Sequence, residues 1–280
     1  MFALNGRGAK AAERWRHRPP PMCELLALSA NSPTDMRFSF RGLRRRGGAT
    51  SHHADGWGLA SYAPDGLGLR LYREDAAAAF SPLAEQVTAL GLRAHCSIAH
   101  IRKATRGVVA MENCHPFHRL WQGQSWVFAH NGHLEGQVDL PPDLQPLGGT
   151  DSEAAFCWLL DQLRRRGVGG EADGRLFAAL VAIADQLAAR GSFNALVANG
   201  QWLFAYAGTR LHRLTRQAPF GSATLADDDL RMDFTRTSAP DDVVTLLSTE
   251  PLTRDEHWLA LEPGEALLLR HGQILHSRQR

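Results

Sequence analysis

Residues 22–26 read Met22-Cys23-Glu24-Leu25-Leu26, and a cysteine placed directly after a methionine can become the first residue of a mature protein. Such a residue carries both a thiol and a free α-amine. The thiolate is the nucleophile, and an unperturbed thiol is mostly protonated at neutral pH, so a base is needed nearby. An α-amine, with a pKa of about 8, can be that base. The stretch favours one residue that is nucleophile and base together, although free cysteine more often packs as a small hydrophobe.

The segment before this cysteine does not resemble part of a fold. Residues 1–22 are rich in Ala, Arg and Gly, end in Pro19-Pro20-Pro21, and lack the apolar core of a secretory signal. We expect a disordered N-terminal extension, with one domain over residues 23–280. Three origins of the extension are open: a start codon assigned too early, with Met22 the true start; a propeptide whose removal frees Cys23; or a genuine flexible tail.

Composition places the chain among ordinary globular proteins, with 44% hydrophobic and 21% charged residues. No run approaches the roughly 18 apolar residues that a membrane-spanning helix needs, so no membrane association is expected. The extension holds five basic residues and one acidic residue, which leaves the remainder mildly acidic and gives no support for nucleic-acid binding. The four cysteines form no CxxC pair, and a reducing cytoplasm is the expected location.

The order of expected elements indicates separate layers of strands and helices. Hydrophobic periodicity predicts strands at both ends of the chain and two long amphipathic helices, at 151–163 and 173–190, between them. Two further helices are expected near the N-terminus, at 36–46 and 81–90. Strands are expected from Cys23, at 57–62, 67–73, 97–102, 126–130, 193–198, 202–207, 243–249, 266–270 and 273–276.

Several short motifs recur in an order and spacing that resemble those of the class II glutamine amidotransferases, which use an N-terminal nucleophile, and especially of their stand-alone YafJ-like members. The resemblance spans residues 23–270. Each motif is weak alone, and together they are specific. After Cys23 they are His53-Ala54-Asp55-Gly56-Trp57-Gly58, His100-Ile101-Arg102-Lys103-Ala104-Thr105-Arg106-Gly107, Asn113-Cys114-His115-Pro116-Phe117, Phe128-Ala129-His130-Asn131-Gly132, Thr150-Asp151-Ser152-Glu153 and Ser248-Thr249-Glu250-Pro251-Leu252-Thr253.

The resemblance implies an α+β fold, the αββα sandwich of Ntn hydrolases, and it implies roles for particular residues. Cys23 would attack the γ-amide carbonyl, and its own α-amine would carry the proton. Asn131 and Gly132 would donate hydrogen bonds to the tetrahedral oxyanion. At the other end of the substrate, Arg102 would bind the α-carboxylate with help from Thr105, and Asp151 would bind the α-ammonium.

Some of these residues also have simpler interpretations. Asn131-Gly132 is by itself a good hairpin turn, and Asp151 could serve only as a favourable charge at a helix N-terminus. Better-known relatives such as glucosamine-6-phosphate synthase have Trp and His where this chain has Lys103 and Arg106, which leaves the secondary contacts of the carboxylate open.

The implied function is glutaminase-type hydrolysis of glutamine or of a γ-glutamyl compound, with no cofactor and no metal. The chain would then hydrolyse alone or supply ammonia to a separate acceptor or synthase subunit. The alternatives are an amidohydrolase for one γ-glutamyl metabolite, of the ergothioneine or glutathione pathway type, and a non-catalytic glutamine-sensing module.

Overall fold

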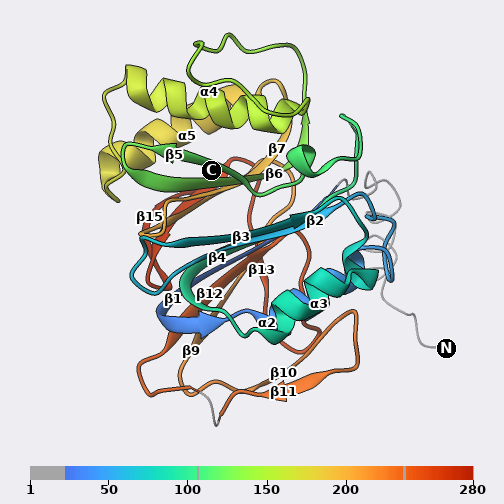
Figure 1. Ribbon diagram of the computed structural model, residues 1–280. Helices are drawn as coiled ribbons and strands as arrows, with labels where there is room; N and C mark the ends of the chain where they lie inside the picture. Colours follow the sequence, from blue (N-terminus) through green and yellow to red (C-terminus); the bar gives the residue numbers. More distant parts are fainter. Residues whose placement is uncertain (1–22, 106, 236–237, 280) are drawn as a thin grey trace, which may run out of the picture.

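Two antiparallel sheets stacked face to face form the centre of the molecule in this computed structural model, which describes residues 23–105, 107–235 and 238–279 (Figure 1). The predicted N-terminal extension and Arg106 lie outside the described residues. The first sheet has seven strands in the order β13-β9-β12-β1-β4-β2-β3. Their bounds are β1 Glu24–Asp35, β2 Trp57–Tyr62, β3 Leu69–Glu74, β4 Arg93–Ile101, β9 His212–Gln217, β12 Val243–Ser248 and β13 Leu259–Ala260.

The second sheet has six strands in the order β15-β14-β8-β7-β6-β5. Its strands are β5 Phe117–Trp121, β6 Gln124–Leu134, β7 Gly191–Ala198, β8 Leu203–Ala207, β14 Glu265–Arg270 and β15 Gln273–Arg278. A separate pair, β10 Ser222–Thr224 and β11 Arg231–Asp233, projects below the seven-stranded sheet (Figure 1).

Helices cover the outer face of each sheet, which gives four layers. The helices α4 (Asp151–Arg165) and α5 (Gly174–Ala188) lie over the six-stranded sheet, and α2 (Arg37–Arg46) and α3 (Pro82–Ala89) lie against the seven-stranded one (Figure 1). Short 3-10 turns occupy Ala78–Phe80 and Met111–Asn113. The predicted αββα sandwich is therefore confirmed.

Strand β1 shows how alternation along a strand builds the layers. Leu25 and Ala27 face the core between the two sheets, while Leu26 and Leu28 face the core beneath α2 and α3. Because successive side chains of a strand point to opposite faces, one strand contributes to two cores. An apolar run with no polar face, as in residues 25–28, is the pattern of a strand buried on both sides.

Most predicted elements are present, and their ends follow from local chemistry. Ser81 caps α3 by accepting a hydrogen bond from the backbone N–H of Ala84 at 2.9 Å, and Asp173 caps α5 through Leu176 N at 2.7 Å. Five strands were not predicted from the sequence: β5, β9, β10, β11 and β13.

One interpretation of the sequence is wrong in detail. Asn131-Gly132 is no hairpin turn, because β6 continues to Leu134 and pairs Asn131 with Asn194 and Gly132 with Phe193. The pair therefore lies within a strand, where the sheet fixes its position.

Candidate active site

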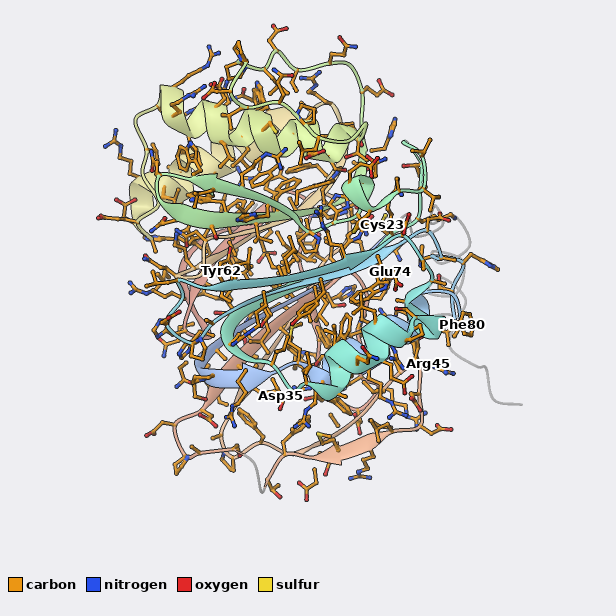
Figure 2. All side chains as sticks on the ribbon, in the orientation of Figure 1. Cys23, Asp35, Arg45, Tyr62, Glu74 and Phe80 are labelled. Carbon is orange, nitrogen blue, oxygen red and sulfur yellow. The ribbon has the colours of Figure 1, made fainter. Side chains whose placement is uncertain are left out.

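Cys23 lies immediately before β1, near one end of the boundary between the sheets (Figure 2). β1 is flanked by β4 and β12, so the residues that follow these partners meet the cysteine. The backbone N–H of Lys103 is 3.3 Å from Cys23 Sγ, and the thiol is 3.5 Å from the Lys103 carbonyl oxygen. The position at the strand end thus places the sulfur against the turn that follows β4.

Asn131 reaches Cys23 from the opposite sheet. Its side-chain Nδ2 donates to the carbonyl oxygen of Cys23 at 2.6 Å, and it lies 3.3 Å from Thr249 Oγ1. Both asparagine and cysteine are buried. The structure therefore brings the predicted nucleophile and the predicted oxyanion donor into direct contact.

Thr249, which follows β12, is a site residue to which the sequence reading gave no role. Its Oγ1 accepts a hydrogen bond from the backbone N–H of Leu25 at 2.9 Å, next to its contact with Asn131. The backbone N–H of Thr249 in turn donates to Leu25 O at 3.1 Å. Thr249 thus connects the start of β1 to the asparagine of the facing sheet, and its place in the motif of residues 248–253 was the available signal.

Burial raises the pKa of the Cys23 thiol to about 12, against the opposing effects of the Lys103 N–H and the positive charge of Arg102. Desolvation disfavours the thiolate more than these neighbours favour it. The thiol is therefore protonated at neutral pH, and any reaction at this sulfur needs a base.

Gly132 lies where the backbone of β6 is too crowded for a side chain. A Cβ atom at this position would lie 1.9 Å from Ser192 O and 2.6 Å from His130 Nε2. Pairing between β5 and β6 ends at Phe128, so among the described residues no strand pairs with that edge of β6 further along. The adjoining open edge is where backbone groups can meet a ligand.

Arg102 follows β4 and is 3% exposed. Its backbone N–H donates to Gly56 O at 2.8 Å, and its guanidinium lies 3.4 Å from Asp55 O and 3.2 Å from Val108 O. Asp55 Oδ2 accepts the backbone N–H of Ala104 at 2.8 Å. Asp55 therefore holds the turn that carries both Arg102 and the neighbour of Cys23, a role that the sequence reading did not assign.

Hydrogen bonds through the loop after β4 link this arginine to the segment just before α4. Thr105 lies exposed on that loop. Val108 O, which accepts from Arg102, also accepts from Asn113 Nδ2 at 3.0 Å. Asn113 Oδ1 then accepts from Gly149 N at 2.9 Å, two residues before Asp151. The predicted carboxylate-binding and ammonium-binding residues are thus linked through hydrogen bonds.

Asp151 is the first residue of α4. Its Oδ2 accepts the backbone N–H of Leu134 at 2.7 Å, and its Oδ1 accepts that of Ser152 at 2.9 Å. The ring of His133 lies 3.6 Å from the same carboxylate. Asp151 is therefore more than a helix charge, because it also fixes α4 to the end of β6.

Cys114 and His115 turn to different neighbours. The Cys114 thiol lies 3.4 Å from Glu74 O and from Ala110 O, while the His115 ring packs at a tilt against His100, with centroids 4.2 Å apart. This arrangement gives no thiol-imidazole pair of the kind that activates a cysteine.

Arg46 is the last residue of α2, and its side chain lies inside the protein rather than in solvent. It is buried, 3.2 Å from Glu24 Oε2 and 2.7 Å from Asp227 Oδ2, and it donates to Pro251 O at 2.6 Å. Burial raises the pKa of Glu24 to about 7, and Arg46 opposes that rise. The residue after Cys23 is therefore anchored by a buried ion network.

Among the described residues, no group of three or more His, Cys, Asp or Glu side chains could hold a metal ion. Within the same part of the chain, no helix combines the length and apolar character needed to cross a membrane.

The profile of the class-II glutamine amidotransferases matches residues 22–280, so the chain belongs to this family. YafJ of Escherichia coli (strain K12) is 46% identical over 246 residues, which cover 87% of this chain and 96% of YafJ. A glutamine amidotransferase homologue from Haemophilus influenzae is 42% identical over 253 residues, covering 90% of this chain and 85% of that protein.

Solved structures agree with the fold. A Pseudomonas aeruginosa protein assigned to the glutamine amidotransferases superposes with a TM-score of 0.72 at 40% identity, covering 91% of this chain and all of that one. A class-II domain protein from Silicibacter pomeroyi gives a TM-score of 0.51 at 18% identity, with 92% and 99% covered, and shows the fold alone. The fold is that of the Ntn-hydrolase glutamine amidotransferases.

Proposed function

We propose that this chain hydrolyses the γ-amide of glutamine or of a γ-glutamyl compound, with Cys23 as an N-terminal nucleophile. The observation that carries the proposal is the contact across the two sheets, in which Asn131 Nδ2 meets the carbonyl group of Cys23 at 2.6 Å. An amide donor beside the nucleophile is the arrangement that acyl transfer requires.

The reaction proceeds through a thioester. Cys23 Sγ attacks the γ-carbonyl carbon, the thiol proton passes through the α-amine to the departing nitrogen, and the C–N bond breaks to release ammonia or an amine. Water then cleaves the thioester and releases glutamate. Because burial raises the thiol pKa to about 12, a thiolate formed ahead of the attack would be costly, so the amine accepts the proton as attack proceeds.

Asn131 and Gly132 bind the oxyanion in this proposal. Cys23 O and Thr249 Oγ1 already hold the Asn131 amide nitrogen beside the nucleophile. The longer contact, 3.3 Å to Thr249, is the one that the oxyanion would replace when the charge develops. Gly132 allows the backbone to approach because it has no Cβ.

Arg102, Thr105 and Asp151 bind the amino-acid end of the substrate, with the guanidinium on the α-carboxylate and the aspartate on the α-ammonium. Lys103 takes part through its backbone, which already contacts Cys23 Sγ. These residues read only groups that glutamine shares with every γ-glutamyl amide, so the leaving amine is less restricted than the amino-acid end.

The test begins with the N-terminus. An acylated Cys23 nitrogen is an amide and no base, so active protein should have Cys23 as its first residue by mass spectrometry. A protein starting at Met1 should gain activity only when residues 1–22 are lost. Full activity of the uncleaved chain would overturn the mechanism.

The second part of the test identifies the nucleophile. Cys23→Ala should reduce glutamine hydrolysis by a factor on the order of 10⁶, and Cys96→Ala, which changes a buried thiol elsewhere in the core, should retain activity. A glutamine-mimicking electrophile should label Cys23 in preference to Cys114. Predominant labelling of Cys114 would move the active site, and glutamine binding without turnover in Cys23-terminated protein would favour a sensor.

A further inference from the structure

His130 is a buried histidine that the proposed reaction does not use. It precedes Asn131 on β6, and adjacent side chains of a strand point to opposite faces. Its ring is 1% exposed and packs against Phe193, with ring centroids 4.9 Å apart. It therefore lies behind the oxyanion residues, on the face of the sheet that α4 covers.

The hydrogen bonds of His130 define which nitrogen carries the proton. Nε2 lies 3.1 Å from the carbonyl oxygen of Ser192, which can only accept, so Nε2 is the donor. Nδ1 is then the acceptor, and the Ser152 hydroxyl donates to it at 2.8 Å. Burial lowers the pKa of His130 to about 4, so the ring stays neutral and keeps this arrangement at neutral pH.

Ser152 is the residue that follows Asp151 at the start of α4. The Asp151 carboxylate accepts from Ser152 N and from Leu134 N. The start of α4 is therefore fixed to β6 at two points, one through Asp151 and one through the buried pair of Ser152 and His130.

We propose that His130 and Ser152 are positioning residues that set the separation between the oxyanion donors on β6 and Asp151 on α4. This inference rests on the function proposed above. Glutamine must engage both ends of the site at once, so the separation decides whether its amide reaches the nucleophile while its ammonium is bound. Rate depends steeply on such placement, since an error of about 1 Å can cost on the order of 100-fold.

The experiment compares two substrates in wild type and Ser152→Ala. Glutamine uses both ends of the site, whereas glutaric acid monoamide lacks the α-amine and does not need Asp151. We expect Ser152→Ala to lower kcat/KM for glutamine by at least about fivefold, the worth of one hydrogen bond. The value for the monoamide should stay within about twofold of wild type.

A double-mutant cycle tests the same inference with glutamine as the only substrate. In an Asp151→Ala background there is no ammonium contact to position, so adding Ser152→Ala should have little further effect. Ser97→Ala is the matched control, because it removes another buried hydroxyl contact, from Ser97 Oγ to Ser61 Oγ at 3.2 Å, in the other sheet. It should leave the ratio of the two substrates at the wild-type value.

Equal losses on both substrates, or an additive cycle, would overturn the inference and leave the pair a purely structural role. Melting temperatures separate misfolding from misplacement, and Ser152→Cys, which keeps a weak donor of similar size, replaces Ser152→Ala if that variant does not fold. No glutamine hydrolysis by Cys23-terminated wild type would instead overturn the proposed function, and the inference with it.

Discussion

The two ends of the candidate site are built differently. At the reacting end, Cys23 directly precedes β1 of one sheet, Asn131 lies on β6 of the facing sheet, and the amide nitrogen is 2.6 Å from the Cys23 carbonyl oxygen. At the amino-acid end, Arg102 and Asp151 come from a turn and a helix start, and they are linked through Val108 and Asn113 of an intervening loop. The comparison teaches that the sheets alone fix the proposed reacting end, whereas the proposed amino-acid end depends on a loop in addition to the contact of Asp151 with β6.

Apart from loss of the nucleophile itself, the largest effect is expected at the amino-acid end. Arg102→Ala or Asp151→Ala leaves one charge of the substrate unpaired in a partly dry site. Each should cost about 2 to 5 kcal/mol of transition-state stabilisation, measured as a fall in kcat/KM. Steady-state kinetics with glutamine, asparagine and several γ-glutamyl amides measures this. Asparagine should be a poor substrate, and some γ-glutamyl amides should be cleaved.

A surface arginine provides the control for that series. Arg41 is half-exposed and pairs with Asp228, so Arg41→Ala should leave kcat/KM unchanged. Wild-type rates in both Arg102→Ala and Asp151→Ala, or equal cleavage of asparagine and glutamine, would show that the amino-acid end has been misplaced.

A somewhat smaller effect is expected at the reacting end. Asn131→Ala removes one oxyanion donor, which typically costs about 3 kcal/mol, and the loss should fall on kcat with little change in KM. Thr249→Val keeps the side-chain shape but removes the oxygen that contacts Asn131, so it should lower kcat less. A raised KM with an unchanged kcat in Asn131→Ala would assign this residue to the amino-acid end and break the comparison.

The smallest effect per residue and pH unit concerns stability in acid, to which three buried histidines contribute. Burial lowers the pKa of His100 to about 3, of His130 to about 4, and of His115 well below its ordinary value of 6.5. As the pH falls below 6.5, the unfolded chain binds protons that the folded protein does not. Each histidine therefore lowers the free energy of unfolding by up to about 1.4 kcal/mol per pH unit.

Glu24 acts in the opposite direction, because its pKa is raised to about 7 and the folded protein takes up the proton first. Three histidines outweigh one glutamate, so urea unfolding should show stability falling from about pH 6.5 to about pH 4.5. His115→Phe should reduce the slope of that fall, since it removes one titrating group and keeps an aromatic ring beside Phe117. A flat profile across this interval would contradict the prediction.

The sequence was sufficient for the layers and for most elements, because each has a local signal. The helix at Asp151–Arg165 has its cap at Thr150 and apolar residues at helical spacing, and β1 has an apolar run of strand length. The short edge strand β13 has only two residues, Leu259 and Ala260, and no periodicity can be read from so few. Asn131-Gly132 was open to misreading because this dipeptide favours turns and only strand pairing overrides that preference.

The motifs gave expected roles to the residues that would touch the substrate. They gave no role to the residues that hold these in place, although several of them stand in the same motifs. Thr249, Asp55 and Ser152 act through partners distant in the chain, such as Leu25 and His130. Arg46 is the clearest case, because its partner Asp227 lies 181 residues away and nothing in a run of three arginines indicates burial. Such contacts exist only after folding, so sequence pattern alone cannot predict them.

The central position of β1 has a consequence for the order in which this protein can assemble. β1 pairs with β4, and on its other side with β12, whose first residue is Val243 (Figure 1). A ribosome makes Cys23 among the first residues of the domain, but Thr249 and the carbonyl group of Pro251 are made more than two hundred residues later. Contacts of such long range slow folding, because the intervening chain must be ordered before they form. During synthesis, β1 therefore cannot pair with β12, and the contacts around Cys23 cannot be completed, until nearly the whole domain has been made.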